Sequence, residues 1–246
     1  MKKAVASAFS PTDIAGLQLW LDATTGLFDA TSGGSAVTAD AAAVARWEDQ
    51  SGNARHATQG TLNNRPVLKT SVQNSKNGIR FDGSNDFMTT ASFAHSVPLT
   101  IFLACKRLSN SGSVGDYNRI IEHGSNNGVA IITRGAVGGF KINYQYANSA
   151  VSDSGVDPST NTQIIEYFVD SSSPRNLTFR LNNANETIST RTGTPATPTV
   201  FNLVQFGGAS YNANVELYEL CYYNVKITDS ERDSVRNYLN AKWSIY

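Results

Sequence analysis

The sequence NGIRFDGSNDFM, residues 77–88, contains the pattern that decides the fold class. Apolar and polar residues alternate from Ile79 to Asp82, which is the period of a β-strand with one buried side. The polar residues 82–86 form a turn signal, and Phe87 resumes the apolar pattern behind it. We therefore predict two short strands that fold into a hairpin around this turn.

Further segments with strand periodicity follow along the chain. The most apolar one covers residues 97–106, and we predict that it is a central strand. Residues 140–146 and 177–181 alternate strictly, as expected of strands with one buried and one solvent-facing side. The pattern predicts an all-β fold, an antiparallel β-sandwich. Its other strands are predicted at residues 17–22, 119–122, 129–133, 163–169, 200–206 and 215–224.

One segment near the end of the chain has helical periodicity instead. Thr228 and Glu231 have the spacing of a capping box, which marks the start of a helix. The apolar residues of one helix face then follow at helical spacing: Val235, Tyr238, Leu239 and Trp243. We expect this C-terminal α-helix to pack on the sandwich.

The composition argues against two classes of partner. The chain of 246 residues has 20 basic and 20 acidic side chains, so it lacks the broad positive field that holds nucleic acid or an anionic membrane. We therefore expect neither partner. Cys105 and Cys221 each lie in an apolar run, and we expect both to be buried and reduced, although a single disulfide between them stays possible.

The first residues differ in character from the rest of the chain. Residues 1–16 are small, polar and aperiodic, and they contain Pro11 and Gly16. We expect an extended N-terminal arm outside the core, followed by a single domain over residues 17–246. The apolar part of this arm is too short for a signal peptide, so we expect no cleaved leader. Such an arm could attach the domain to another protein.

Ordered motifs run through the chain from Leu17 to Trp243. They are LWLDA at residues 19–23, WEDQSGNARHA at 47–57, RP at 65–66 and FDGSND at 81–86, followed by a closing segment at 219–243. This order resembles that of laminin-G-like domains of the concanavalin A-like lectin and glucanase superfamily, found in phage virion and bacterial surface proteins. The resemblance implies a jelly-roll sandwich that binds ligands or assembles with other proteins.

Catalysis is not expected. Retaining glucanases of this superfamily carry two acids on one strand that approach the same sugar about 5 Å apart. The nearest match here is Glu216 and Glu219, which are three residues apart and would point to opposite faces of a regular strand. A bulge could bring them to one face, but no assisting Asp lies between them. The histidines have no partner at metal-ligand spacing, and they are His56, His95 and His123.

A calcium site at the sandwich rim is implied by the resemblance. Asp82, Asn85 and Asp86 place three oxygen-bearing side chains on one turn, and calcium prefers oxygen ligands. The alternative, which we prefer, is that these side chains bond the backbone amides of their own turn. Apart from calcium, no cofactor is expected.

Candidate glycan-binding residues combine aromatic rings, which stack on sugars, with amides, which bond hydroxyl groups. The alternative is ordinary edge packing and turn chemistry. The candidates lie near predicted strand ends: Tyr117, Asn118, Asn143, Tyr144, Gln145, Tyr146, Tyr211 and Asn212.

The leading hypothesis is a non-catalytic binding or assembly module on a phage virion surface, such as a decoration protein, head fibre or tail receptor-binding component. Its expected partners are capsid or tail proteins, reached through the N-terminal arm, and host cell-surface polysaccharide. We also expect a homo-oligomer. The alternative is a lectin domain of a bacterial secreted or cell-surface protein, and a glycoside hydrolase is third.

Overall fold

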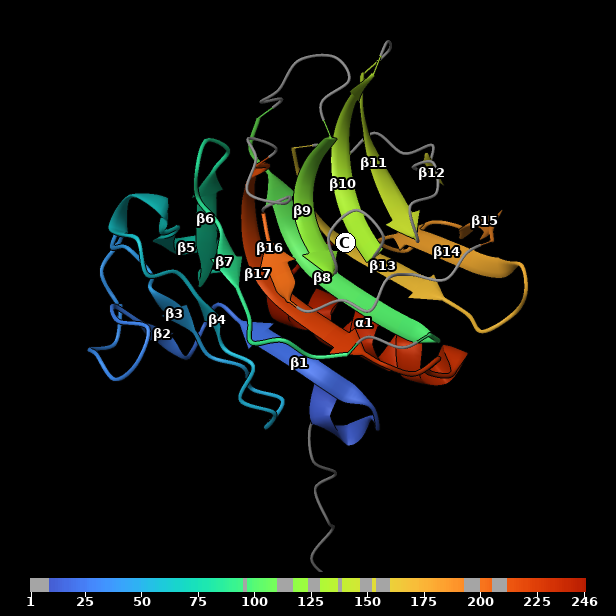
Figure 1. Ribbon diagram of the computed structural model, residues 1–246, viewed down its shortest axis with the longest axis horizontal. Helices are drawn as coiled ribbons and strands as arrows, with labels where there is room; N and C mark the ends of the chain where they lie inside the picture. The colour runs from blue at the N-terminus through green and yellow to red at the C-terminus, as the bar shows by residue number, and fades with distance from the viewer. Residues whose placement is uncertain are drawn as a thin grey trace, which may run out of the picture.

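A computed structural model of the chain shows two antiparallel sheets packed face to face, with one α-helix behind them (Figure 1). It describes residues 9–94, 97–109, 117–123, 129–136, 139–146, 152–153, 160–192, 200–204 and 212–246. Side chains of both sheets join in one hydrophobic core. The predicted all-β sandwich is therefore confirmed.

The first sheet has eight strands, and β8 lies in its middle as predicted. Beside the main order, β1 (Leu17–Asp22) pairs with β17. The main order runs β15 (Thr187–Arg191), β14 (Arg175–Leu181), β13 (Thr162–Val169), β8 (Leu99–Arg107), β17 (Asn214–Tyr223), β6 (Lys76–Asp82) and β5 (Val67–Gln73).

The second sheet has nine strands, several of them only two residues long. Short 3-10 helices at Pro11–Asp13 (η1) and Leu62–Asn64 (η2) complete the elements outside the sheets. The order runs β12 (Ser152–Asp153), β11 (Gly139–Tyr146), β10 (Val129–Ala136), β9 (Tyr117–His123), β16 (Phe201–Leu203), β7 (Met88–Thr89), β4 (Ala57–Thr58), β3 (Arg46–Trp47) and β2 (Leu27–Phe28). Residues 205 and 206 of the predicted strand at 200–206 lie outside the described residues.

The hairpin predicted at residues 77–88 is wrong in its pairing. Strand β6 belongs to the first sheet and β7 to the second, so the turn between them crosses from one sheet to the other. The hairpin partner of β6 is β5, which precedes it. The crossover turn requires Gly83, whose φ of 78° lies in the left-handed region. Both kinds of connection follow a polar turn, so the local sequence does not distinguish them.

Strand β17 holds the first sheet together because it has two successive partners on the same side. Its first part pairs with β6 and its second part pairs with β1, while β8 runs along its other edge. The register against β8 shifts between Leu217 and Glu219, which leaves Tyr218 as the extra residue of a β-bulge. The ring of Tyr218 stacks on Trp243 with a centroid distance of 5.2 Å.

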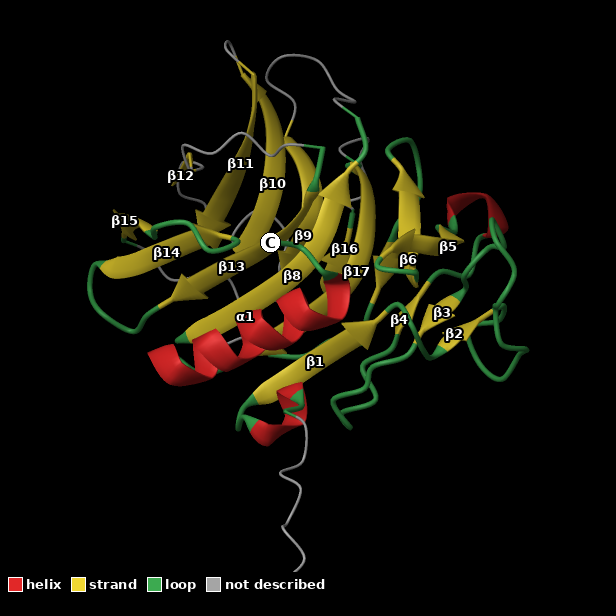
Figure 2. Ribbon diagram, turned by 180° about the vertical axis from the view of Figure 1, so that it is seen from behind, coloured by secondary structure: helices red, strands yellow, loops and turns green. Residues whose placement is uncertain are grey.

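The helix α1 (Asp229–Trp243) lies across the outer face of the first sheet (Figure 2). Thr228 and Glu231 form the predicted capping box. The predicted apolar face is buried at Val235, Leu239 and Trp243, whereas Tyr238 is half-buried. No helix in the described part of the chain combines the length and the apolarity needed for a membrane span.

Two buried arginines on the helix were not predicted. Arg232 and Arg236 are each only 5% exposed, and both donate to the buried carboxylate of Glu166 on β13. The helix therefore contacts the sheet through ion pairs as well as through apolar side chains. Periodicity of apolar residues gives no signal for such contacts.

The N-terminal segment differs from the expected extended arm. Residues 9–16 pack on the sandwich, because Ile14 is in the hydrophobic core and Pro11 is buried. The hydroxyl of Tyr223 donates to the carbonyl oxygen of Pro11 at 3.1 Å. Phe9 contacts the ring of Tyr238 edge-on at 5.9 Å. Residues 1–8 lie outside the described residues.

Both cysteines are buried and free, as expected. Burial raises the pKa of the Cys105 thiol to about 12 and also raises the pKa of Cys221. Neither thiol is therefore ionised near neutral pH, and neither is a candidate nucleophile.

Candidate functional site

The crossover turn lies at one end of the sandwich, together with other polar residues. Asp82 pairs with Asn214 across β6 and β17, which lie side by side in Figure 1. A backbone bridge also joins Asn212 to Arg119 on β9. We call this polar group the rim, and it comprises Asn63, Asn64, Asp82, Ser84, Asn85, Asp86, Asn212 and Asn214.

Carboxylates of the rim organise their own turn. The Oδ1 atom of Asp82 accepts from the backbone N–H of Ser84 at 2.7 Å and of Asn85 at 3.3 Å. The Oδ2 atom of Asp86 accepts from the N–H of Asp82 at 3.0 Å. The sequence analysis preferred this interpretation, in which the side chains of the turn accept hydrogen bonds from its own backbone amides.

A complete calcium shell is not provided by the described residues of the rim. Calcium takes six to eight oxygens, and two carboxylate oxygens here are already used by backbone amides. Within the described residues, no group of three or more His, Cys, Asp or Glu side chains is placed to hold a metal ion. The calcium site remains a prediction from the resemblance.

Amide groups of the rim direct their N–H donors toward the protein. Asn85 Nδ2 donates to the carbonyl oxygen of Asn63, and to Asn64 Oδ1 at 2.9 Å. Asn212 Nδ2 donates to the carbonyl oxygen of Ser84 at 3.2 Å. The Oδ1 atom of Asn212 is buried and has no hydrogen-bond partner among the described residues. Asn85 and Asn212 thus use amide donors within the protein, while Asn212 Oδ1 is left without a donor from the described residues.

Asp86 is the most perturbed acid of the rim. Its residue is 7% exposed, and burial raises the pKa of its carboxyl to about 6. The negative charge of Asp82 also raises this pKa, while the hydrogen bond from the Asp82 backbone lowers it. An exposed carboxylate and a buried carboxylate thus lie close together on one turn.

The predicted glycan-binding residues do not form one group in the structure. Asn212 is a buried residue of the rim and bridges to Arg119 on β9, and the buried Asn118 is the neighbour of Arg119 in sequence. Tyr211 lies outside the described residues. Tyr117 lies on β9, and the other four predicted positions lie on β11, namely Asn143, Tyr144, Gln145 and Tyr146.

Strand register separates the β11 positions from Tyr117. Tyr117 pairs with Arg134, which in turn pairs with Lys141. Tyr144 is three residues further along β11, or roughly 10 Å at the rise of a β-strand. The side chains of β11 lie outside the described residues, so the β11 positions stay a prediction. The rim is the candidate site that described side chains build.

The two acids of β17 do not point to opposite faces, because a bulge interrupts the regular strand between them. Glu216 accepts from the hydroxyl of Tyr218, which stacks on the helix residue Trp243. Glu219 accepts directly from the indole of Trp243. The bulge at Tyr218 therefore places both carboxylates on the helix-covered face.

Both carboxylates are nevertheless buried and bonded. Glu216 is 2% exposed and pairs with Arg80, whereas Glu219 is fully buried. Glu219 Oε1 accepts from Trp20 Nε1 and from the Tyr238 hydroxyl, both at 2.7 Å. Its Oε2 accepts from Trp243 Nε1 at 2.7 Å and contacts Lys242 Nζ at 2.8 Å.

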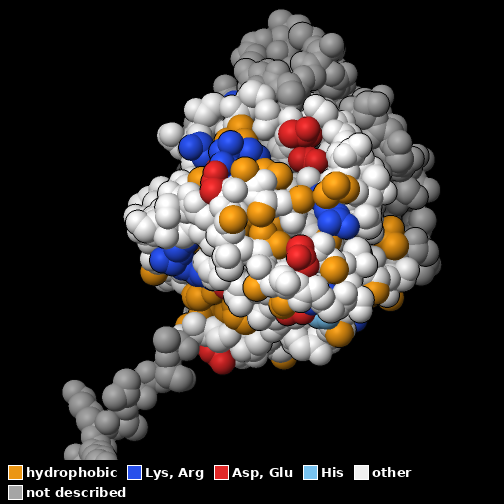
Figure 3. Space-filling model, turned by 90° about the vertical axis from the view of Figure 1, so that its left-hand side faces the viewer, with side chains coloured by type: hydrophobic (Ala, Val, Ile, Leu, Met, Phe, Trp, Pro, Cys, Tyr) orange, Lys and Arg blue, Asp and Glu red, His pale blue; other side chains and the backbone are white. Residues whose placement is uncertain are grey.

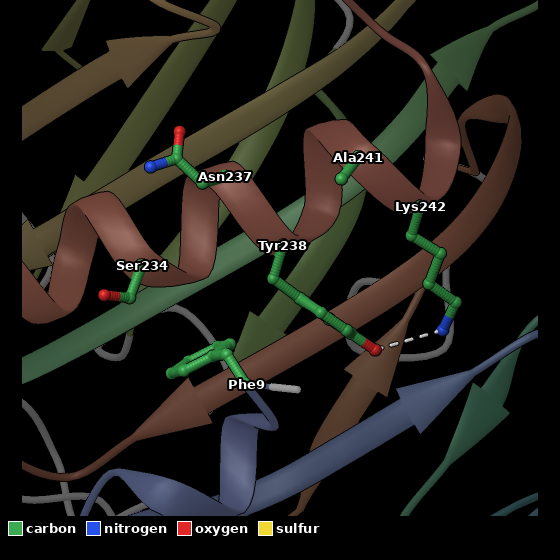
Figure 4. Close-up of a pocket in the computed structure, with 6 residues that line it drawn as sticks. All are labelled: Phe9, Ser234, Asn237, Tyr238, Ala241 and Lys242. Atoms are coloured by element: carbon green, nitrogen blue, oxygen red, sulfur yellow. Dashed lines mark hydrogen bonds between the residues drawn. The ribbon is translucent and has the colours of Figure 1, made fainter. Parts of the chain in front are cut away.

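A shallow groove of about 580 Å³ lies between the helix and the N-terminal segment. Figure 4 shows Phe9 beside the ring of Tyr238, whose hydroxyl reaches Lys242. The Lys242 ammonium is already paired with Asp22 Oδ2 at 2.6 Å and with Glu219. The polar groups of Tyr238 and Lys242 in this groove thus connect the helix to the sheet. Its lining comprises Phe9, Ser234, Asn237, Tyr238, Ala241 and Lys242.

The surface beside strands β2 to β6 has no field of a single charge. Figure 3 shows acidic and basic side chains on this face, separated by hydrophobic and uncharged groups. This distribution agrees with the zero formal net charge of the chain.

No protein-family model and no curated protein matches the sequence. Solved structures do match. The binding domain of Paraclostridial mosquitocidal protein 1 is 14% identical with a TM-score of 0.65, covering 94% of this chain and 54% of that chain. The receptor-binding domain of botulinum neurotoxin type G is 11% identical with a TM-score of 0.60, covering 91% and 51%. Trypanosoma rangeli sialidase is 11% identical with a TM-score of 0.58, covering 93% and 33%.

These likenesses show the fold alone, because the identities are low. The chain has the β-sandwich fold of these proteins. It spans about half the length of the two toxin chains and a third of the sialidase. Two of these structures are binding domains and one is an enzyme, so the fold is compatible with either kind of function. The narrower laminin-G-like assignment remains an interpretation of the sequence motifs.

Proposed function

We propose that the chain is a non-catalytic binding module that recognises carbohydrate through the rim. The observation that carries this proposal is the cluster of side-chain amides and carboxylates at one end of the sandwich. Planar amides and carboxylates are suited to bonding the hydroxyl groups of sugars. Their positions are fixed by bonds to the backbone, which lowers the entropy lost on binding.

The burial and pairing of the two acids on β17 support a binding module over a hydrolase. A glycosidase needs one acid that can donate a proton to the sugar and a second that can attack it or activate water. Glu219 is fully buried and bonded to four side-chain donors, while Glu216 is paired with Arg80. A sugar would have to displace buried side-chain contacts to reach either one.

A glycan array combined with a turnover assay tests this function. The wild-type protein is expected to bind at least one glycan class without releasing reducing ends. Asn85→Ala is expected to weaken binding at least tenfold, because Asn85 is exposed and holds the turn against residues 63 and 64. Asn237→Ala on the helix is the control, since Asn237 is also exposed but lies away from the rim. Release of reducing ends, or equal loss in both variants, would contradict the proposal.

The setting that we propose is the surface of a phage virion, with the domain as a homo-oligomeric decoration, fibre or tail receptor-binding component. This setting rests on the sequence resemblance. We propose residues 1–8 as the attachment element, since residues 9–16 pack on the sandwich. Deletion of residues 1–8 should abolish attachment to particles. If the full chain does not attach to particles, the alternative is favoured, namely a lectin domain of a bacterial surface protein.

A further inference from the structure

Asp82 and Asp86 form a pair of acids with no cationic partner among the described residues. The described buried acids on the strands of the first sheet are ion-paired: Glu166 with Arg232 and Arg236, Glu216 with Arg80, and both Asp22 and Glu219 with Lys242. At the rim, by contrast, Asp82 raises the pKa of Asp86, and no basic side chain contributes to that shift. Two like charges on one turn are a source of repulsion that a bound cation would relieve.

Asn212 supplies a second, independent observation. It is 5% exposed, and its Nδ2 donates to the carbonyl oxygen of Ser84, so its amide lies against the same turn. Its Oδ1 has no hydrogen-bond partner among the described residues. A buried acceptor that lacks a donor is destabilising, and a ligand that provides a donor relieves this cost.

We propose that the rim binds the protonated primary amine of a saccharide, which means an amino sugar whose nitrogen is not acetylated. This inference rests on the proposed carbohydrate-binding function. An ammonium group has three donors and no acceptor. It therefore complements a site where Asp82 and Asp86 provide negative charge and Asn212 provides a neutral acceptor.

Other classes of sugar fit less well. A neutral hydroxyl group is recognised best by paired donors and acceptors, but the amide donors of Asn85 and Asn212 are used within the protein. An acidic sugar would be repelled by the two carboxylates. The side chain of lysine carries the same ammonium group, so a lysine peptide is the competing ligand that the experiment must separate.

Calorimetric titration with three hexasaccharides tests the inference at pH 6.5, which lies above the pKa of about 6 of the Asp86 carboxyl and still protonates much of the sugar amine. The probes are the glucosamine hexamer, its fully N-acetylated counterpart and cellohexaose. We expect the glucosamine hexamer to bind at least tenfold more tightly than the other two. A trilysine peptide is expected to bind at least tenfold more weakly than the glucosamine hexamer, and equal or tighter binding of the peptide overturns the saccharide assignment.

Asp82→Asn is the decisive variant because it removes the charge and keeps the oxygen that accepts from residues 84 and 85. It should weaken binding of the glucosamine hexamer at least tenfold. Asp170→Asn is the matched control. Asp170 accepts from the backbone of Ser172 and Asn176 in the same way, but it follows β13 at the opposite end of the first sheet. Equal affinity of wild type and Asp82→Asn overturns the inference.

Amide chemical shifts of residues 84 and 85 locate binding without any substitution. Shifts with the N-acetylated hexamer or cellohexaose, but not with the glucosamine hexamer, overturn the amine inference and leave the proposed function intact. Absence of shifts at the rim with all three saccharides overturns both.

Discussion

Trp243 on the helix donates its indole N–H to the buried carboxylate of Glu219 on β17 at 2.7 Å. Trp20 on β1 donates to the other oxygen of the same carboxylate. One side chain in the first sheet therefore holds both the N-terminal strand and the C-terminal helix. Burial raises the pKa of Glu219, while the ammonium of Lys242 lowers it.

Replacement of Glu219 by Gln should destabilise the protein by about 3 kcal/mol. The buried donors around residue 219 lose an anionic acceptor, and the side-chain NH₂ of the new glutamine would point at donors instead of acceptors. Urea unfolding followed by tryptophan fluorescence measures the change. Glu48→Gln is the control, since Glu48 makes a partly exposed ion pair with Arg46 at 3.2 Å and should cost less than about 1 kcal/mol. Equal unfolding midpoints for wild type and Glu219→Gln would show that this contact does not hold the helix.

Asp86→Asn should stabilise the protein at pH 7.5 and have no effect near pH 4. The pKa of Asp86 is raised from 3.8 to about 6 in the folded state, so the folded protein takes up this proton more readily than the unfolded chain. The contribution of Asp86 to stability therefore increases as pH falls from 7 toward 4. Asparagine removes this dependence and keeps an acceptor for the N–H of Asp82.

The difference in unfolding free energy between Asp86→Asn and wild type, measured across this pH range, checks the prediction. We expect a difference of about 1 kcal/mol or more at pH 7.5, since one pKa unit corresponds to about 1.4 kcal/mol. A difference that is constant with pH would mean that the Asp86 carboxyl titrates normally.

Calcium should have little effect on stability. The Oδ1 atom of Asp82 and the Oδ2 atom of Asp86 are bonded to backbone amides, and calcium requires six to eight oxygens. Millimolar calcium or a chelator is expected to shift the melting temperature by less than about 1 °C, because a ligand that does not bind the folded state cannot stabilise it. A calcium-dependent increase that Asp82→Asn abolishes would instead establish the metal site implied by the resemblance.

Deletion of residues 1–14 should destabilise the domain relative to deletion of residues 1–8. The longer deletion removes the buried side chain of Ile14, the carbonyl acceptor of Pro11 and the ring of Phe9. Loss of one buried aliphatic side chain alone costs about 2–5 kcal/mol. Thermal unfolding of both truncated proteins checks this prediction, and similar melting temperatures would show that residues 9–14 are dispensable.

The sequence was sufficient for the fold class because period-2 alternation and the capping box act over a few residues. It identified β8 as a central strand and placed the start of the helix at Thr228. It failed where a partner distant in the chain decides the outcome. The turn at residues 82–86 is polar whether it closes a hairpin or crosses between sheets, and the bulge at Tyr218 depends on packing against Trp243.

The rim could be predicted only in part, for a related reason. Asp82, Asn85 and Asp86 are adjacent in sequence, so their grouping was evident. Asn212 joins them only because β17 begins beside the end of β6, a strand pairing across more than 100 residues. The positions of the aromatic residues along β11 could not be predicted from the sequence. They depend on the register of β11 against β10, which is a tertiary contact.

The position of β17 between β8, β6 and β1 has a consequence for biosynthesis. A ribosome releases β8, β6 and β1 before residues 214–223, so the first sheet cannot close until β17 has been made. Nascent chains that stop before this strand leave the edges of three strands unsatisfied and available for aggregation. Folding should therefore be late and concerted, completed only after the last two elements have left the exit tunnel.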